Sequence, residues 1–189
     1  MNEQETVPPS ARRTRWHDLA RDLAEAGAFR VGVRPWNWLE LGADEAALVW
    51  ELLAGFVEFL NDRYGVDSAT RIPPCWAEHG AVVEELTTLA FSHWQAFCSP
   101  EASITDAQSW HNRVLPTFYE RLGRWLKGTR IHCDVGRHRD TETTARGDLE
   151  AWSERVHARA VADVTTRRER ERAARSAARS SEHAQERQS

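Results

Sequence analysis

Apolar residues recur every three or four positions between residues 43 and 64, which is the period of an amphipathic α-helix. Acidic residues at Asp44, Glu51 and Glu58 recur every seven positions on the opposite side. Further apolar residues widen the stripe, so we expect this helix to lie near the centre of the fold with neighbours on more than one side. The stripe and its flanks consist of Ala46, Leu48, Val49, Trp50, Leu52, Leu53, Phe56, Val57, Phe59, Leu60 and Tyr64.

Two later stretches show the same period and predict two more core helices. The first follows Pro73 and Pro74, which suit the first turn of a helix, and should run to about Phe97. Its expected inner stripe is His79, Val83, Leu86, Ala90, His93 and Phe97, flanked by Trp76 and Trp94. The second follows Ser103, and Pro116 must kink or split it. Its expected inner side is Ala107, Trp110, His111, Val114, Phe118, Leu122 and Trp125.

The N-terminal quarter is less regular. A helix is expected from Ser10, a suitable N-cap, to about Ala26, ahead of Gly27. Residues 29–41 alternate apolar and other residues around a proline, and either a short strand or a loop held by its aromatic side chains fits this pattern. If the segment is extended, Trp36 and Trp38 point the same way.

These patterns predict an all-α fold, a small helical bundle with a tryptophan-rich core. The chain has 189 residues and nine tryptophans, which suffice for one compact domain with a bulky aromatic interior. We expect a disordered N-terminus over 1–10, a helical domain over 11–138, a linker over 139–147, a charged helix over 148–178 and a disordered tail over 179–189. The charged helix carries a thin apolar stripe that could pack on the domain or on a second copy: Leu149, Trp152, Val156, Ala160 and Val164.

Charge is unevenly distributed along the chain. Residues 35–99 carry ten acidic and two basic side chains, whereas residues 151–189 carry nine arginines and six acidic residues. The terminal arginines could contact the phosphates of a nucleic acid. Glutamates interrupt the run, however, and mixed-charge runs usually form solvated helices stabilised by pairs four residues apart. The candidate nucleic-acid contacts are Arg167, Arg168, Arg170, Arg172, Arg175 and Arg179.

The motifs typical of common enzymes are absent: the sequence has no Gly-rich phosphate loop, no G-x-S-x-G and no H-E-x-x-H. Cysteine and histidine residues could in principle converge on zinc, with Cys75, His79, Cys133 and His138 as the candidates, but no C-x-x-C pair supports this. The alternative is that the cysteines are small buried apolar residues with free thiols and the histidines line the core. We therefore predict no catalytic residue and no cofactor.

Several of these segments together resemble an uncharacterised domain family of actinobacteria, which is often encoded on plasmids and other integrating elements. The resemblance covers about residues 50–138. It rests on Trp76-Ala77-Glu78-His79 at the start of a helix, then Leu86, Leu89 and Trp94, then Trp110 six residues before Pro116, then Cys133 five residues before His138. It implies that any shared role depends on Trp76, His79, Trp94, Trp110, Pro116, Cys133 and His138. It also implies an accessory protein of a mobile element, acting beside replication or conjugative-transfer machinery.

The sequence as a whole favours a non-enzymatic helical interaction module. Its acidic front half and basic terminal helix offer surfaces to protein partners. The alternatives are a DNA-associated accessory factor that uses the terminal arginines, and a zinc-binding domain. Residues 1–10 lack the apolar stretch of a secretory signal and no run of about 18 apolar residues occurs. The expected location is therefore the cytoplasm, with no membrane partner.

Overall fold

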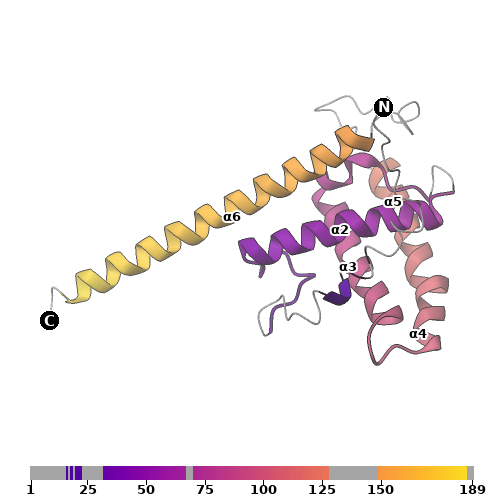
Figure 1. Ribbon diagram of the computed structural model, residues 1–189, viewed down its shortest axis with the longest axis horizontal. Coiled ribbons are helices and arrows are strands. Elements are labelled where there is room, and N and C mark those ends of the chain that lie inside the picture. Colours follow the sequence, from indigo (N-terminus) through magenta and orange to yellow (C-terminus); the bar gives the residue numbers. More distant parts are fainter. Residues whose placement is uncertain are drawn as a thin grey trace, which may run out of the picture.

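The computed structural model describes residues 16, 18, 20–22, 32–66, 70–127 and 149–186. Over these residues the fold is all-helical and contains no strand, as the periodicity predicted. Figure 1 shows helices gathered into a body from which one long helix extends. The elements are α2 (Ala43–Tyr64), the 3₁₀ helix η1 (Pro74–Glu78), α3 (Gly80–Phe97), α4 (Ile104–Ser109), the π-helical turn η2 (Trp110–Val114), α5 (Leu115–Lys127) and α6 (Leu149–Glu186).

Helix α2 is central, as its wide apolar arc predicted. It packs against α3 and α6, and Trp16, from the helical residues near the N-terminus, lies against Gly55. The residues of its stripe and flanks are buried, except Leu48 and Tyr64, which are partly buried; Val49, Leu53 and Phe56 are fully buried. Burial of several large apolar side chains at roughly 1.5–3 kcal/mol each makes α2 the main contributor to the core.

The core contains two aromatic clusters. In the first, Trp50 of α2 lies between Trp38 and Trp76, with ring centroids 5.1 and 6.0 Å away. The indole N–H of Trp38 donates to the Thr87 hydroxyl at 2.9 Å, so this polar group is satisfied inside the core. The tryptophans therefore join the loop before α2, α2 itself and η1.

The second cluster surrounds His93 of α3. The ring of His93 lies 4.8 Å from that of Trp110 and 4.5 Å from that of Phe97, measured between centroids. Trp16, Phe56 and Phe59 complete the surroundings. The expectation that His93 lines the core is confirmed, since its side chain is buried.

The prediction of a single helix from Pro73 to Phe97 is wrong in one respect, because the helix is interrupted at His79. This residue has an extended backbone and is the N-cap of α3, with Gly80 as the first helical residue. Its carbonyl accepts the backbone N–H groups of Val82 and Val83 at 2.8 and 2.9 Å. Cys75, in η1, and His79 therefore do not share one face of a regular helix.

The helix after Ser103 is divided, as Pro116 required. Ser103 caps α4, since its hydroxyl accepts the Asp106 N–H at 3.2 Å. Pro116 has no N–H with which to continue the hydrogen bonding of the preceding turn. That turn is the wider π-helical turn η2, in which the Leu115 N–H donates to the Trp110 carbonyl. The wider turn shifts the phase of the stripe. His111 and Val114, which were expected to face inward, are therefore exposed, whereas Trp110, Phe118 and Leu122 are buried.

The segment expected near 29–41 is a loop over its described part, residues 32–41, and not a strand. The turns of this loop remove the alternation that a strand would have, so Trp36 and Trp38 differ in their exposure to solvent. Trp38 is 8% exposed and belongs to the core, whereas Trp36 is 47% exposed and packs edge-on against Phe91. The alternative of a loop held by aromatic side chains is the correct one.

Helix α6 is longer than the sequence pattern suggested. It continues to Glu186, although a disordered tail was expected from residue 179. The reason is local, because neither glycine nor proline occurs between 149 and 189 and most residues there favour helix. The expected segment 1–10, the linker 139–147 and the last three residues lie outside the described ranges. Among the described helices, none combines the length and the apolar content needed to cross a bilayer.

Candidate functional site

The first half of α6 is docked on the body. Val164 is buried, and Val156 and Ala160 are half-buried against the core, so these three residues of the thin apolar stripe pack on the domain itself. The neighbours of this face are α2 and η1. The docked half thus covers the tryptophan cluster formed by Trp38, Trp50 and Trp76.

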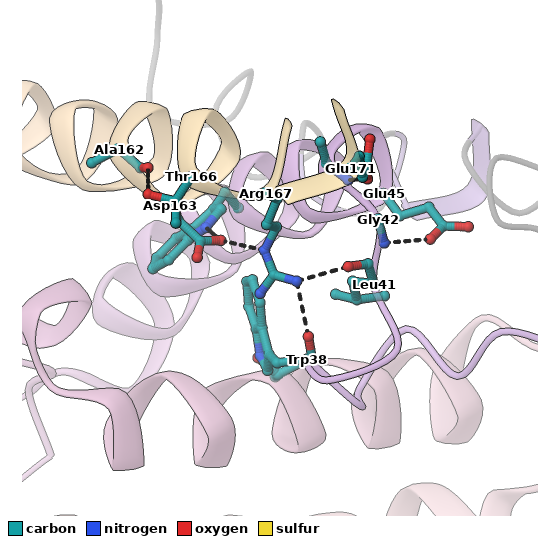
Figure 2. Close-up of polar contacts among 12 residues, drawn as sticks. Trp38, Leu41, Gly42, Glu45, Ala162, Asp163, Thr166, Arg167 and Glu171 are labelled. Atoms are coloured by element: carbon teal, nitrogen blue, oxygen red, sulfur yellow. Dashed lines mark hydrogen bonds and ion pairs between the residues drawn. The ribbon is translucent and has the colours of Figure 1, made fainter. Parts of the chain in front are cut away.

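Arg167 fixes the helix to the loop before α2 (Figure 2). Its Nη1 donates to the carbonyl oxygens of Trp38 at 3.0 Å and Leu41 at 2.7 Å, and its Nε donates to Asp163 at 2.9 Å. The guanidinium also lies 5.7 Å from the centroid of the Trp38 ring. With a side chain only 18% exposed, Arg167 is part of the packed interior rather than a free surface cation.

Two carboxylates of α6 complete this contact. Asp163 accepts the indole N–H of Trp50 at 3.1 Å as well as the Arg167 bond. Glu171 accepts the backbone N–H of Ala43, the first residue of α2, at 2.8 Å. That N–H has no partner within α2, and a negative charge beside it is favourable at a helix N-terminus. We call Asp163, Arg167 and Glu171 the anchor of α6.

Beyond the anchor, the helix leaves the body. We call Arg172–Glu186 the projecting segment; Figure 1 shows it continuing past the start of α2 toward the C-terminus. Side chains from Arg172 to Ser180 are all exposed. The projecting segment is therefore a preformed helix that offers every face of its described part to solvent or to a partner.

The six candidate arginines do not form one set. Arg167 belongs to the anchor, and Arg168 pairs with Asp44 at 3.0 Å between Nη2 and Oδ1. Arg175 lies 3.6 Å from Glu171, an exposed pair one turn apart. Arg170, Arg172 and Arg179 are exposed.

The residues on which the family resemblance rests have mixed environments. Trp76 and Trp110 are buried core residues, and Trp94 is partly buried and packs against the core. The indole N–H of Trp110 donates to the Ser92 hydroxyl at 3.2 Å. His79 caps α3, and Pro116 is exposed near the start of α5. Cys133 and His138 lie outside the described residues.

The described members of the candidate metal set are not arranged as ligands. Cys75 is buried, and burial raises the pKa of its thiol, which disfavours the thiolate that zinc requires. Within the described ranges, no three His, Cys, Asp or Glu side chains come close enough to hold a metal ion. Cys75 and Cys98 both have free thiols, as expected.

A groove that the sequence did not indicate runs between α3 and the segment from Ser109 to Arg121. Its volume is about 520 Å³, within the range of small-molecule sites. Leu89 and Phe118 supply apolar lining, and an ion pair between Glu85 and Arg121 crosses it. Because these two charges already satisfy each other, the groove offers Arg113 as its remaining charged side chain.

Sequence reasoning missed the anchor as a unit. Arg167 was assigned to phosphate contact, and Asp163 and Glu171 were not singled out. One signal was available: Asp163 lies among Val156, Ala160 and Val164 on the apolar stripe, and it precedes Arg167 by four residues. Their partners in the loop are backbone carbonyls, which no sequence pattern distinguishes.

No known protein-family model matches the chain, and no curated protein or solved structure matches it significantly. The resemblance over about residues 50–138, with the mobile-element setting that it implies, stays a prediction.

Proposed function

We propose that this protein is a non-enzymatic helical interaction module, in which the projecting segment of α6 binds a protein partner. The observation that carries the proposal is the division of α6 at Glu171. Residues up to Glu171 are held on the body by the anchor and by Val164, whereas the described side chains beyond it are exposed. A body that holds one end of a long helix and leaves the other end exposed is suited to presenting that end.

The physical advantage is preorganisation. Isolated helices shorter than about 12–15 residues are marginal in water, because nucleation of the first turn is costly. Here the docked half supplies the nucleus, and the alanines and arginines of the projecting segment propagate the helix well. A partner therefore does not have to order this segment on binding, which lowers the entropic cost of the complex.

Because the projecting segment carries arginines, nucleic acid is the alternative partner. Arginines at 172, 175 and 179 could contact phosphates. Arg167 supports this alternative less than the sequence suggested, since it is enclosed by Asp163 and two carbonyl groups. An accessory role beside the replication or transfer machinery of a bacterial mobile element completes the proposal, and it rests on the family resemblance alone.

The test is site-specific photocrosslinking of the full chain in cells. A photoreactive amino acid replaces Ala177 on the projecting segment, and in a matched control it replaces Gln95, an exposed residue of α3. We expect discrete protein adducts from position 177 and none of the same adducts from position 95. Identical adducts from both positions, or adducts at 177 with nucleic acid alone, would overturn the proposal.

A further inference from the structure

Four arginines share one exposed face of α6 where it leaves the body. Arg168, Arg172, Arg175 and Arg179 follow one another at intervals of four, three and four residues, which places them on one side of an α-helix. The anchor residues face a direction roughly 100° away around the same helix. The four side chains are exposed, and we call them the basic stripe.

An acidic counterpart lies on the outer face of α2. Asp44, Glu51, Glu58 and Asp62 are exposed and recur at intervals of seven, seven and four residues. We call them the acidic stripe. Only Asp44 has a basic partner within the described part of the chain, and this partner is Arg168. The other three carboxylates make no ion pair with any described residue.

The two stripes begin at the same point and extend in opposite directions. Trp50 bonds to Asp163 whereas Ala43 bonds to Glu171, so α6 runs antiparallel to α2. The pair formed by Arg168 and Asp44 joins the start of one stripe to the start of the other. From this junction α6 continues beyond the body and α2 continues along it (Figure 1).

One seven-residue step is the same on the two sides of the junction. Arg175 follows Arg168 by seven positions, and Glu51 follows Asp44 by seven positions. At 1.5 Å per residue, both lie about 10 Å from the junction. A two-fold rotation through the junction therefore brings Arg175 of one copy opposite Glu51 of another, and the reverse.

We propose that the partner of the projecting segment is a second copy of this chain, with the basic stripe of each copy lying along the acidic stripe of the other. This proposal rests on the proposed function and names the partner. The interface is isologous, since both copies use the same two stripes and the arrangement closes as a dimer. Exposed ion pairs are individually weak and screened by salt, so the dimer is weak and dissociates as ionic strength rises.

Nucleic acid fits this surface less well. A duplex lying along α6 would follow the basic stripe and then meet Asp44 and Glu51 on the neighbouring part of the body. The negative charge of those residues would oppose the phosphates, and the chain as a whole has a formal charge of −4. A surface that is basic at one end and acidic at the other is complementary to its own two-fold image.

The test is sedimentation analysis of the full chain and two charge-reversed variants, Glu51→Arg with Glu58→Arg, and Arg175→Glu with Arg179→Glu. We expect the wild-type protein to dimerise at concentrations up to about 200 µM in 50 mM NaCl, with a dissociation constant at least about tenfold higher in 300 mM NaCl. Each variant alone should stay monomeric, because the reversed side chains then face residues of the same sign on the other copy. An equimolar mixture of the two variants should regain the dimer, because every facing pair is again of opposite charge.

Matched controls separate this effect from general changes of charge. Glu120→Arg and Arg124→Glu alter exposed residues of α5 outside both stripes, and should dimerise like the wild type. All variants should retain the wild-type circular dichroism and melting temperature, since no buried side chain changes. A monomeric wild type at low salt, or a mixture of variants that stays monomeric while both are folded, overturns the proposal.

A titration with duplex DNA under the same conditions distinguishes a nucleic-acid partner from a protein partner. If DNA binds, and Arg175→Glu with Arg179→Glu abolishes that binding while the wild type stays monomeric, the stripe serves nucleic acid and both proposals fail. If the wild type is monomeric but position 177 crosslinks to a different protein, the interaction module stands and self-association is wrong.

Discussion

At the scale of single residues, position in the fold decides what an arginine does. Arg167 and Arg170 belong to one basic run in the sequence, yet the first is enclosed by the anchor and the second is exposed. An arginine can donate five hydrogen bonds in a fixed planar geometry. Arg167 uses this geometry to bridge Asp163 and two carbonyl oxygens of the loop before α2.

Replacing Arg167 with alanine should therefore destabilise the protein. The change leaves the carbonyls of Trp38 and Leu41 without the Arg167 donor and leaves Asp163 with Trp50 as its other donor, and we expect a loss of about 2 kcal/mol in the free energy of unfolding. Urea denaturation followed by tryptophan fluorescence measures this loss. Arg170→Ala is the control and should change stability by less than about 0.5 kcal/mol. Equal effects from the two substitutions would contradict the role assigned to Arg167.

Tyr119 of α5 provides a prediction of pH dependence. Its hydroxyl is buried and has no hydrogen-bond partner within the described part of the chain. Burial, followed by the nearby Tyr64, raises the pKa of Tyr119 to about 12. In the unfolded chain a tyrosine ionises near pH 10, so the unfolded state loses its proton first as the pH rises. The stability contributed by neutral Tyr119 is present below about pH 10 and is lost between about pH 10 and 12.

Substitution of Tyr119 by phenylalanine should remove both the unsatisfied hydroxyl and this alkaline loss. We expect the variant to be more stable than wild type by about 1 kcal/mol at neutral pH, with a larger difference near pH 11. Urea denaturation at the two pH values measures it. The chain has two tyrosines, so phenolate absorbance shows directly whether the step near pH 12 disappears. A variant less stable than wild type would show that the hydroxyl has a partner, and persistence of that step would show that it belongs to Tyr64 and not to Tyr119.

At the scale of elements, α6 consists of two functional halves in one uninterrupted helix. The docked half packs on α2 and η1, with Val164 buried, and Glu171 binds the N-terminus of α2. The projecting segment begins immediately after Glu171. The boundary between the two halves is set by the first residue of α2 and by the loop before it, and not by any break in α6.

Two truncations should show that the docked half of α6 stabilises the protein and that the projecting segment does not. Ending the chain after Ala174 keeps one turn beyond Glu171 and should change the melting temperature by no more than about 2 °C, because the described side chains that it removes, residues 175–180, are all exposed. Ending it after Gly147 removes the anchor and Val164 and uncovers the tryptophan cluster. We expect a fall of about 10 °C or more, with binding of a hydrophobic dye. Thermal denaturation measures both, and similar melting temperatures would show that α6 contributes little to the body.

At the scale of the whole molecule, the fold arranges charge as well as apolar surface. A sequence with an acidic front half and a basic end becomes a structure in which the acidic stripe of α2 and the basic stripe of α6 meet at the pair formed by Asp44 and Arg168. The antiparallel packing of α6 on α2 creates this arrangement. Its consequence is the proposed two-fold pairing, and the salt dependence and the mixing of variants test it at this scale.

Much of the fold follows from periodicity along the chain. The position and burial of α2 were predictable because its apolar arc is wide, and the division near Pro116 was predictable because proline lacks an N–H. The break at His79 was not, since the residues around it are compatible with one continuous helix. The exposure of His111 was also missed, because a π-helical turn shifts the phase of a stripe by a fraction of a turn.

The amino-acid sequence by itself determined the helical class, the central place of α2 and the aromatic composition of the core. These are consequences of local preference and of the period at which apolar side chains recur, and both are properties of neighbouring residues. Only the tertiary structure decided which arginine is enclosed, where α6 leaves the body, and that the acidic and basic stripes meet at Asp44 and Arg168. These features depend on contacts between residues more than a hundred positions apart, such as Arg167 with Leu41. Such contacts are fixed by packing and backbone hydrogen bonds, which leave no periodic trace in the sequence.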